Sequence, residues 1–242
     1  MRDVILVTAG TSGIGEAIVS KAADHFRDFQ FIVVYGHDDN KALELEREII
    51  KKGREITFVK CDLTDINATL KMCKNIRNTY SIKYLVLNMG IGTYASFEEY
   101  DYNLWNKVMN TNLTIPAFMI QSFLDNFADS ASILLISSYA GDQPYSSSIV
   151  YGVSKAGVSF MARNLVKVLE RYNVRINAIE PGFIETNWHK TRTNESREII
   201  NRKIAVHRFG YTEEIASIAI AVLENEYMNG SIIPVHGGYD YF

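Results

Sequence analysis

The stretch TAGTSGIG, residues 8–15, decides the fold, because this glycine-rich turn directly follows an apolar run, VILVT at 4–8. Glycines between a strand and a helix let the backbone approach a phosphate group closely. The helix that follows, which we expect to begin near Glu16, offers free N–H groups and a positive dipole end to an anion. A turn of this kind also occurs simply as a tight connection, so the rest of the chain has to decide between a nucleotide site and a plain turn.

Short apolar runs rich in β-branched residues alternate with segments of helical periodicity along the whole chain. One such helical segment is KALELEREIIKK at 41–52, where apolar residues recur among charges. The runs after VILVT, seven in all with it, lie at 31–35, 56–60, 84–88, 133–137, 175–179 and 231–235. Strands that are apolar throughout are buried on both faces, as in a parallel sheet covered by helices. The pattern predicts a doubly wound α/β fold, and without a break in composition it predicts a single domain over residues 1–242.

Composition narrows the class of protein. The chain of 242 residues carries a net charge of −3 with scattered basic residues, whereas nucleic acid or an anionic membrane would require a clustered positive face. Its apolar stretches are shorter than the roughly 20 residues of a membrane span. Cys61 and Cys73 are too few for a disulfide framework, so we expect both to be buried and the compartment to be reducing. Without a visible leader segment we expect a cytoplasmic protein, and without spaced histidine ligands we predict no metal site.

A second motif, VYGVSKAG at 150–157, places Tyr151 four residues before Lys155. On a helix this spacing puts both side chains on one face, where the ammonium can act on the phenol. The pair taken alone also fits two solvent-facing side chains. A free tyrosine, with a pKa near 10, is a poor acid or base at neutral pH, but a neighbouring positive charge favours its phenolate. The pair is therefore a candidate for general acid–base catalysis.

These motifs resemble the short-chain dehydrogenase/reductase superfamily. The turn at 8–15 is similar to the family's T-G-x-x-x-G-x-G turn, and Tyr151 and Lys155 match its Tyr-x-x-x-Lys. Ser138 matches the catalytic serine, and Asn112 in NTNL matches the catalytic asparagine better than Asn110 does. Further similar segments are CDLTD at 61–65, LNMG at 87–90, INAIEPGFIET at 176–186, RFGYTEEIA at 208–216 and VHGG at 235–238. The resemblance covers essentially the whole chain.

The resemblance implies a Rossmann fold with a seven-stranded parallel sheet in the order 3-2-1-4-5-6-7 and helices on both faces. It implies an NAD(P)-dependent enzyme that interconverts a carbonyl and a secondary alcohol by hydride transfer. In that reaction Tyr151 would exchange a proton with the carbonyl oxygen, and Ser138 would orient this oxygen. Lys155 would tune Tyr151 and bind the ribose, while Asn112 would organise a water leading to Lys155.

The resemblance also assigns cofactor contacts to the ends of several strands. The expected residues are Gly10, Thr11, Ser12, Gly13, Ile14, Gly15, Gly36, His37, Asp62, Leu63, Asn88, Gly90, Tyr151, Lys155, Pro181, Gly182, Ile184 and Thr186. An acid after the second strand would bind the ribose 2′-OH of NAD, whereas a basic residue there would bind the 2′-phosphate of NADP. Gly36 stands in the acid's place with His37 beside it, and Thr11 and Ser12 can donate hydrogen bonds. We therefore expect NADP(H) in preference to NAD(H), although two aspartates follow His37.

The chain departs from the family pattern at a few positions. Ala9 replaces the usual first glycine, which costs little provided that its φ is negative. Leu87 and Met89 make LNMG out of the family's NNAG, and they could change how the fourth strand is held. Thr212 is the expected cap of the helix that begins in TEEIA.

The substrate is the least determined feature. The segment 183–210, with Tyr94, Tyr139, Tyr145 and Trp188, suits a polar or carrier-linked carbonyl compound. The chain looks most like 3-oxoacyl-acyl-carrier-protein reductases, and a sugar or polyol dehydrogenase is the alternative. A non-catalytic dinucleotide-sensing or scaffold protein is the alternative from another class. The resemblance further suggests a homotetramer or homodimer, assembled through long helices near 101–127 and 149–172.

Overall fold

The strands form one parallel sheet in a computed structural model that describes residues 1–144 and 148–241. Within these residues the sheet order is β3-β2-β1-β4-β5-β6-β7, which confirms the expected Rossmann topology. The strands are β1 (Arg2–Thr8), β2 (Gln30–Tyr35), β3 (Ile56–Lys60), β4 (Tyr80–Leu87), β5 (Phe127–Ile136), β6 (Val174–Pro181) and β7 (Ile232–Val235).

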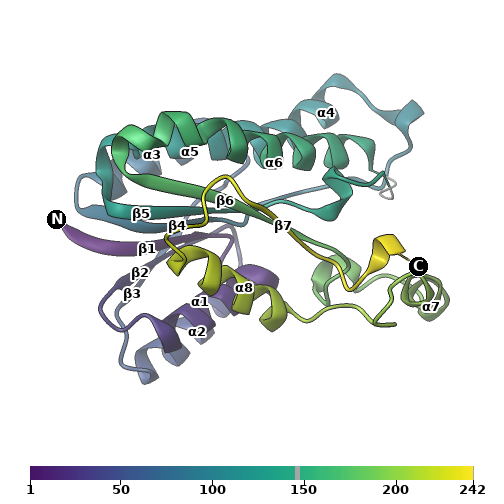
Figure 1. The fold of residues 1–242 in the computed structure, drawn as a ribbon, viewed down its shortest axis with the longest axis horizontal. Helices are drawn as coiled ribbons and strands as arrows, with labels where there is room; N and C mark the ends of the chain where they lie inside the picture. Colours follow the sequence, from purple (N-terminus) through teal and green to yellow (C-terminus); the bar gives the residue numbers. More distant parts are fainter. Residues whose placement is uncertain (145–147, 242) are drawn as a thin grey trace.

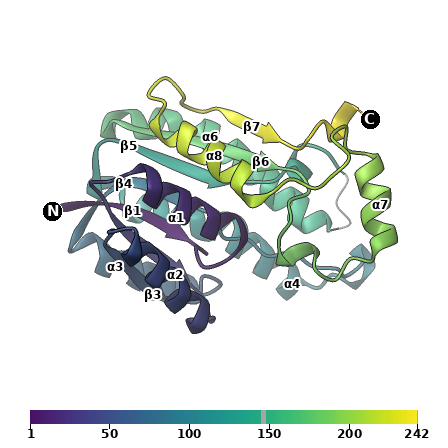
Figure 2. The ribbon, with the colours of Figure 1, turned by 90° about the horizontal axis from the view of Figure 1, so that it is seen from below.

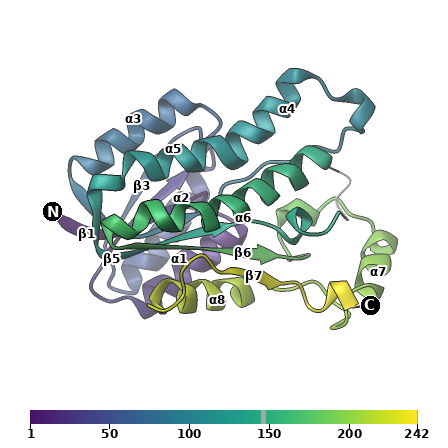
Figure 3. The ribbon, with the colours of Figure 1, turned by 45° about the horizontal axis from the view of Figure 1, so that its top comes forward.

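Helices cover both faces of the sheet (Figure 1). Helices α1, α2 and α8 lie on one face, as the view from below shows (Figure 2). Helices α3, α5 and α6 lie side by side on the other face (Figure 3). The α-helices are α1 (Gly13–His25), α2 (Asp39–Lys51), α3 (Ile66–Arg77), α4 (Tyr102–Met109), α5 (Ile115–Ser122), α6 (Ile149–Leu169), α7 (Asn194–Arg202) and α8 (Thr212–Glu224).

The first strand shows why apolar runs predicted this arrangement. Successive side chains of a strand point to opposite faces. Val4 and Leu6 accordingly pack into the core under α3, α5 and α6, and Ile5 and Val7 pack into the core under α1, α2 and α8. All four side chains are fully buried, because the strand is covered on both sides.

Several element boundaries differ from the sequence expectation. Strands β4 and β5 begin earlier than their apolar runs. Their first residues include polar side chains, which the apolar pattern does not mark as strand, and the pairing of β4 with β5 shifts register after Ile82. The helix expected over 101–127 is interrupted by a π-helical segment, Asn110–Thr114, between α4 and α5. Helix α1 begins at Gly13 and not near Glu16. Thr212 is the first residue of α8 and not its N-cap, which is Tyr211. The Glu214 carboxylate accepts a 2.7 Å hydrogen bond from the Tyr211 N–H.

Two further sequence expectations concern the core and membranes. Cys61 and Cys73 are both free and buried, as expected. None of the helices within the described ranges has the length and apolar character needed to cross a membrane.

Helix α7 and the C-terminus lie beyond the carboxyl ends of β6 and β7 (Figure 1), at the edge where ligands of open α/β sheets bind.

Candidate active site

A cavity of about 820 Å³ opens at the carboxyl ends of β1, β4, β5 and β6. Both members of the Tyr-x-x-x-Lys motif border it, so the motif's spacing does place them in one site. The cavity brings together ten residues expected from the sequence: Ile14, Asn88, Gly90, Ser138, Tyr151, Lys155, Pro181, Gly182, Ile184 and Thr186.

Tyr151 and Lys155 lie one turn apart on α6. The Lys155 Nζ is 5.9 Å from the centre of the Tyr151 ring, and it donates a 2.7 Å hydrogen bond to the Ile136 carbonyl oxygen at the end of β5. Only 3% of Lys155 is exposed. The Tyr151 hydroxyl is hydrogen-bonded to Ser138, which follows β5. Strand β5 and helix α6 together fix the geometry of the three side chains.

Burial sets the protonation of this pair. It raises the pKa of Tyr151, and the hydrogen bond to Ser138 opposes this rise only in part. Burial also lowers the pKa of Lys155 to about 8. The phenol is therefore protonated at neutral pH while the amine still carries its charge. This differs from the sequence expectation that the ammonium would favour the phenolate.

Polar side chains behind α6 hold this helix against the sheet. Glu180 is buried, and burial raises the pKa of its carboxyl group. Its Oε1 lies 2.6 Å from the Ser159 hydroxyl, which lies 2.8 Å from the Ser137 hydroxyl. Ser137 in turn donates to the Lys155 carbonyl oxygen at 2.8 Å. The chain of contacts fixes the backbone of Lys155 relative to β5 and β6.

Asn112 does not border the cavity, and its amide is committed to the protein. Its Oδ1 accepts from the Ile91 N–H, and its Nδ2 donates to the Ile91 carbonyl oxygen, both at 2.8 Å. The second N–H donates to the Ser154 hydroxyl at 2.9 Å. Asn112 therefore ties the loop after β4 to α6, and the π-helical segment allows its side chain to reach both partners.

The glycine-rich turn is tighter than expected. Ala9 has a φ of 49°, which contradicts the condition of a negative φ. A Cβ on Gly15 would lie 2.3 Å from the Ala9 carbonyl oxygen, so only glycine fits there. This carbonyl also accepts from the Asn88 side chain at 3.2 Å. Asn88 thus holds the turn against β4, while Leu87 and Met89 are buried in the core and leave this tie intact.

The start of α1 fits the pyrophosphate of a dinucleotide. Ser12 occupies the N-cap position, but its side chain makes no capping hydrogen bond, and Gly13 has a φ of 55°. The first N–H groups of the helix thus keep no side-chain acceptor among the described residues, and a phosphate can take that place. Gly10 and Thr11, within the turn, are buried.

The adenosine end of the expected site lies after β2 and β3. A Cβ on Gly36 would meet no atom within 4 Å, so this position has room for a ligand. His37 is exposed. Asp62 is also exposed and accepts from the Thr64 N–H and hydroxyl, while the Leu63 side chain packs into the core.

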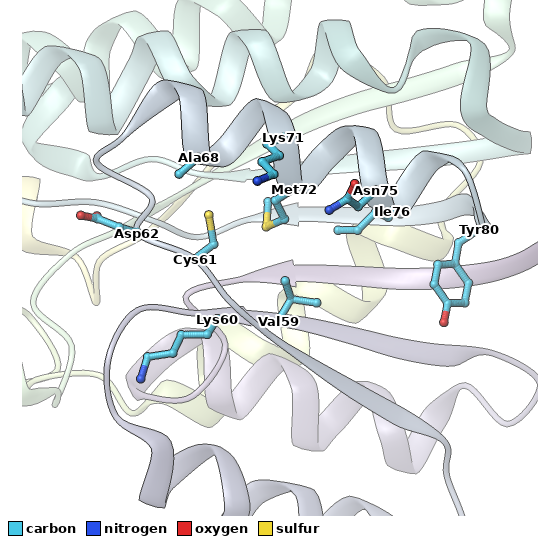
Figure 4. A pocket seen from close by; sticks show the side chains of 10 residues that line it. All are labelled: Val59, Lys60, Cys61, Asp62, Ala68, Lys71, Met72, Asn75, Ile76 and Tyr80. Atoms are coloured by element: carbon cyan, nitrogen blue, oxygen red, sulfur yellow. The ribbon is translucent and has the colours of Figure 1, made fainter.

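Lys60 is a candidate cofactor contact that the sequence motifs do not indicate. It ends β3 and pairs in register with Tyr35 of β2, next to Gly36. Its Nζ is 2.8 Å from Asp39, which also accepts from the Tyr35 hydroxyl at 2.9 Å. Figure 4 shows Lys60 and Asp62 at one end of a pocket of about 490 Å³ between β3 and α3. The expected strand order could have revealed Lys60, because it makes the ends of β2 and β3 neighbours.

The four aromatic residues expected near the substrate have different environments. The Trp188 ring packs on Tyr151 with centres 5.4 Å apart, and the Tyr94 hydroxyl donates to the Trp188 carbonyl oxygen at 3.3 Å. Both border the cavity. Tyr139 instead is 2% exposed and stacks on His236. Tyr145 lies outside the described residues. The expected substrate segment 183–210 includes the cavity residues Arg192 and Lys203 without singling them out. Tyr239, which also borders the cavity, lies outside that segment and far along the chain from the motifs, so it was not predicted.

Possible metal ligands are dispersed. No group of three or more His, Cys, Asp or Glu side chains suited to hold a metal ion occurs in the part of the chain that the structure describes. His189 is buried between the rings of Phe183 and Phe209, where it serves as a packing residue.

Comparisons with known proteins agree with this geometry. A family model described as short chain dehydrogenase matches residues 3–197. The chain is 30% identical to a short-chain dehydrogenase/reductase of a Cladobotryum species, over 96% of this chain and 94% of that protein. It is also 30% identical to a 3-oxoacyl-acyl-carrier-protein reductase of Aquifex aeolicus, over 97% and 96% of the two chains.

Solved structures give the same result. The RhlG protein of Pseudomonas aeruginosa, solved as an NADP active-site complex, has a TM-score of 0.87 and 25% identity to this chain, with 98% of this chain and 96% of that chain covered. The family model spans most of the chain, and the relatives match over nearly their full length. The chain therefore belongs to the short chain dehydrogenase family and is an NAD(P)-dependent oxidoreductase.

Proposed function

We propose that the chain reduces a carbonyl group to a secondary alcohol with NADP(H), and that Tyr151 gives the proton to the carbonyl oxygen. The observation that carries this proposal is the position of Tyr151. Its hydroxyl is bonded to Ser138, and it shares one cavity with Lys155 and the residues that follow β4 and β6. A positioned acid of this kind contributes typically about 10²–10⁴-fold to the rate.

The nicotinamide, when bound, supplies the hydride. Ser138 and Tyr151 offer two hydroxyl groups to one carbonyl oxygen, and Tyr151 is protonated at neutral pH because burial raises its pKa. The Lys155 ammonium stabilises the negative charge that forms on Tyr151 when the proton leaves. Asn112 is a positioning residue in this proposal, since its hydrogen bonds hold the Ile91 backbone and Ser154. Trp188 covers Tyr151 and limits the access of water.

The cofactor would lie along the carboxyl edge of the sheet. The start of α1, including Ser12 and Gly13, would bind the pyrophosphate, and the Pro181–Thr186 segment would contact the nicotinamide. Asn88 and Gly90 would border the ribose, close to Lys155, whose Nζ lies 3.2 Å from the position of a Cβ on Gly90.

The preference for NADP(H) rests on the adenosine end. Gly36 leaves open space there, and Lys60 and His37 are nearby basic residues. The relative of known structure with 25% identity is an NADP complex. Both aspartates after His37 are committed within the protein: Asp38 caps α2 by accepting from the Lys41 N–H, and Asp39 is bonded to Lys60 and Tyr35. Fluorescence titration should give a lower Kd for NADPH than for NADH, and the reverse order would refute this preference.

For the substrate we propose a 3-oxoacyl thioester, with a keto sugar as the second candidate. A curated relative with 30% identity acts as a 3-oxoacyl-acyl-carrier-protein reductase, and Trp188 and Tyr94 offer apolar surface beside polar groups. A panel of 3-oxoacyl thioesters and keto sugars, followed by the absorbance of NADPH, tests both candidates. NADPH binding without turnover of any compound would favour the dinucleotide-sensing alternative.

Helices α5 and α6 carry exposed apolar side chains that suit assembly into a homodimer or homotetramer. We propose that the protein works in a reducing, cytoplasmic compartment. Phe160 and Val153 of α6 are 65% and 45% exposed, and Phe118 of α5 is 43% exposed. Large apolar side chains in such numbers on neighbouring helices are typical of an interface. Light scattering should show an oligomer, and a monomer at working concentration would refute this proposal.

A further inference from the structure

The outer part of the active-site cavity carries unbalanced positive charge. Arg192 and Lys203 border it together with Lys155. Its lining contains no Asp or Glu among the side chains that the structure describes. A cleft lined by one sign of charge focuses the field and attracts ligands of the opposite sign. The cavity therefore favours anions beyond the Tyr151 region.

Arg192 is held in a fixed orientation. Its Nε donates to the Nδ1 of His189 at 3.1 Å, and its Nη1 donates to the Ser196 hydroxyl at 3.4 Å. The guanidinium also lies over the Phe183 ring, 5.7 Å from its centre. His189 accepts without adding negative charge, since burial and the nearby guanidinium groups of Arg192 and Arg197 lower its pKa to about 4. The contacts orient Arg192 and leave its charge unbalanced.

Arg192 is half-buried but forms no ion pair with any described carboxylate. Glu185, in the same segment, is paired with Arg197, whose guanidinium stacks on Phe209 outside the cavity. Charged side chains that lose solvent are normally paired. The planar fork of a guanidinium matches a carboxylate or a phosphate. The Arg192 guanidinium, which has no carboxylate partner among the described residues, is therefore suited to pair with an anionic group of a ligand.

We propose that Arg192, assisted by Lys203, binds an oxyanion on the substrate, either a carboxylate or a phosphate ester. This inference rests on the proposed carbonyl reduction at Tyr151 and not on a thioester as the substrate, since it places the reacting carbonyl at Tyr151 and the anion at Arg192 in the same cavity. The cofactor pyrophosphate is the competing anion, but the start of α1 already provides its N–H groups for it. Substrates with an acidic group on the chain that bears the ketone are thus selected over neutral ones.

The kinetic test compares matched substrates with and without charge. The pairs are acetoacetate with its methyl ester, and dihydroxyacetone phosphate with dihydroxyacetone. In R192Q the ratio of kcat/KM for the charged over the neutral member should fall about tenfold or more, and R192K should restore part of it. R202Q is the matched control, because Arg202 is exposed on α7 and does not border the cavity. Its ratio should match that of the parent protein.

The two pairs distinguish a carboxylate from a phosphate as the preferred anion. An equal fall for charged and neutral substrates in R192Q would overturn the proposal and indicate a structural role. A weaker Kd for NADPH in R192Q with an unchanged substrate ratio would assign Arg192 to the pyrophosphate and would also overturn it. Thermal melting of R192Q and R192K shows whether each variant is folded.

A binding measurement separates this inference from the proposed reaction. Malonate and inorganic phosphate serve as unreactive probes. Their binding is followed by tryptophan fluorescence in a W105F background, where Trp188 in the cavity is the one remaining tryptophan. Saturable quenching by either probe, weakened about tenfold in R192Q but not in R202Q, supports the anion site even if no carbonyl compound is turned over. Absence of saturable quenching by both probes would overturn it, whatever the activity.

Discussion

Replacing Ala9 by glycine should stabilise the protein. Ala9 has a φ of 49°, in the left-handed region. This conformation costs a residue with a Cβ about 1–2 kcal/mol. The greater freedom of glycine in the unfolded chain offsets about 0.5–1 kcal/mol of the gain. A net stabilisation of about 0.5–1 kcal/mol remains, which corresponds to a rise in Tm of roughly 1–4 °C for a chain of this size.

Urea unfolding and thermal melting of A9G measure this effect. Ala221→Gly is the matched control, because Ala221 is exposed within α8 and has ordinary helical geometry. The same substitution there should cost about 1 kcal/mol. A lower Tm for A9G than for the parent protein would show that the turn is unstrained and would refute the reasoning.

Three further predictions concern titration and the turn. Burial lowers the pKa of His189 to about 4. Between pH 6.5 and 4 the unfolded state therefore binds more protons than the folded state. Lowering the pH through this window should reduce the free energy of unfolding by up to about 3 kcal/mol. Urea unfolding at several pH values should show this loss, and H189Q should lack that part of it; equal pH dependence in both would contradict the assignment. Because burial lowers the pKa of Lys155 to about 8, the rate of carbonyl reduction should decline above that pH, and a pH–rate profile that stays flat to pH 10 would refute the role of its charge. Gly15→Ala places a Cβ 2.3 Å from the Ala9 carbonyl oxygen and should lower Tm and dinucleotide affinity, whereas Gly36→Ala meets open space and should leave Tm unchanged; similar Tm values for the two variants would contradict this.

The positions of most strands were predictable because each strand is marked by a short apolar run in its own stretch of sequence. Alternation of apolar runs with helical segments identified the strands, and burial on both faces accounts for runs such as VILVT. The boundaries were less accurate where the chain departs from the pattern, as at Ile82, where the register shifts. At the interruption, Asn112 is hydrogen-bonded to Ile91, which is 21 residues away along the chain, and a local pattern does not show such a contact. The order of the strands came from the family resemblance and not from periodicity.

The site was predictable in its motif residues and in the aromatic residues Tyr94 and Trp188, but not in its electrostatics. Spacing on one helix brought Tyr151 and Lys155 together, but spacing says nothing about burial, which raises the pKa of the phenol instead of lowering it. Tyr139 does not border the cavity but is buried and stacks on His236, a residue far along the chain. Lys60 and Arg192 each border a pocket because of strand pairing and the fold of the segment before α7, and neither belongs to a motif.

The central claim is that the Tyr151 hydroxyl donates the proton while the rest of the cavity binds the reactants. The most direct test is the single-turnover rate of NADPH oxidation in Y151F with a substrate of the parent protein, alongside the Kd for NADPH. We predict a rate about 10²–10⁴-fold lower, with a Kd within about twofold of the parent value. A near-normal rate in a folded Y151F protein would contradict the account.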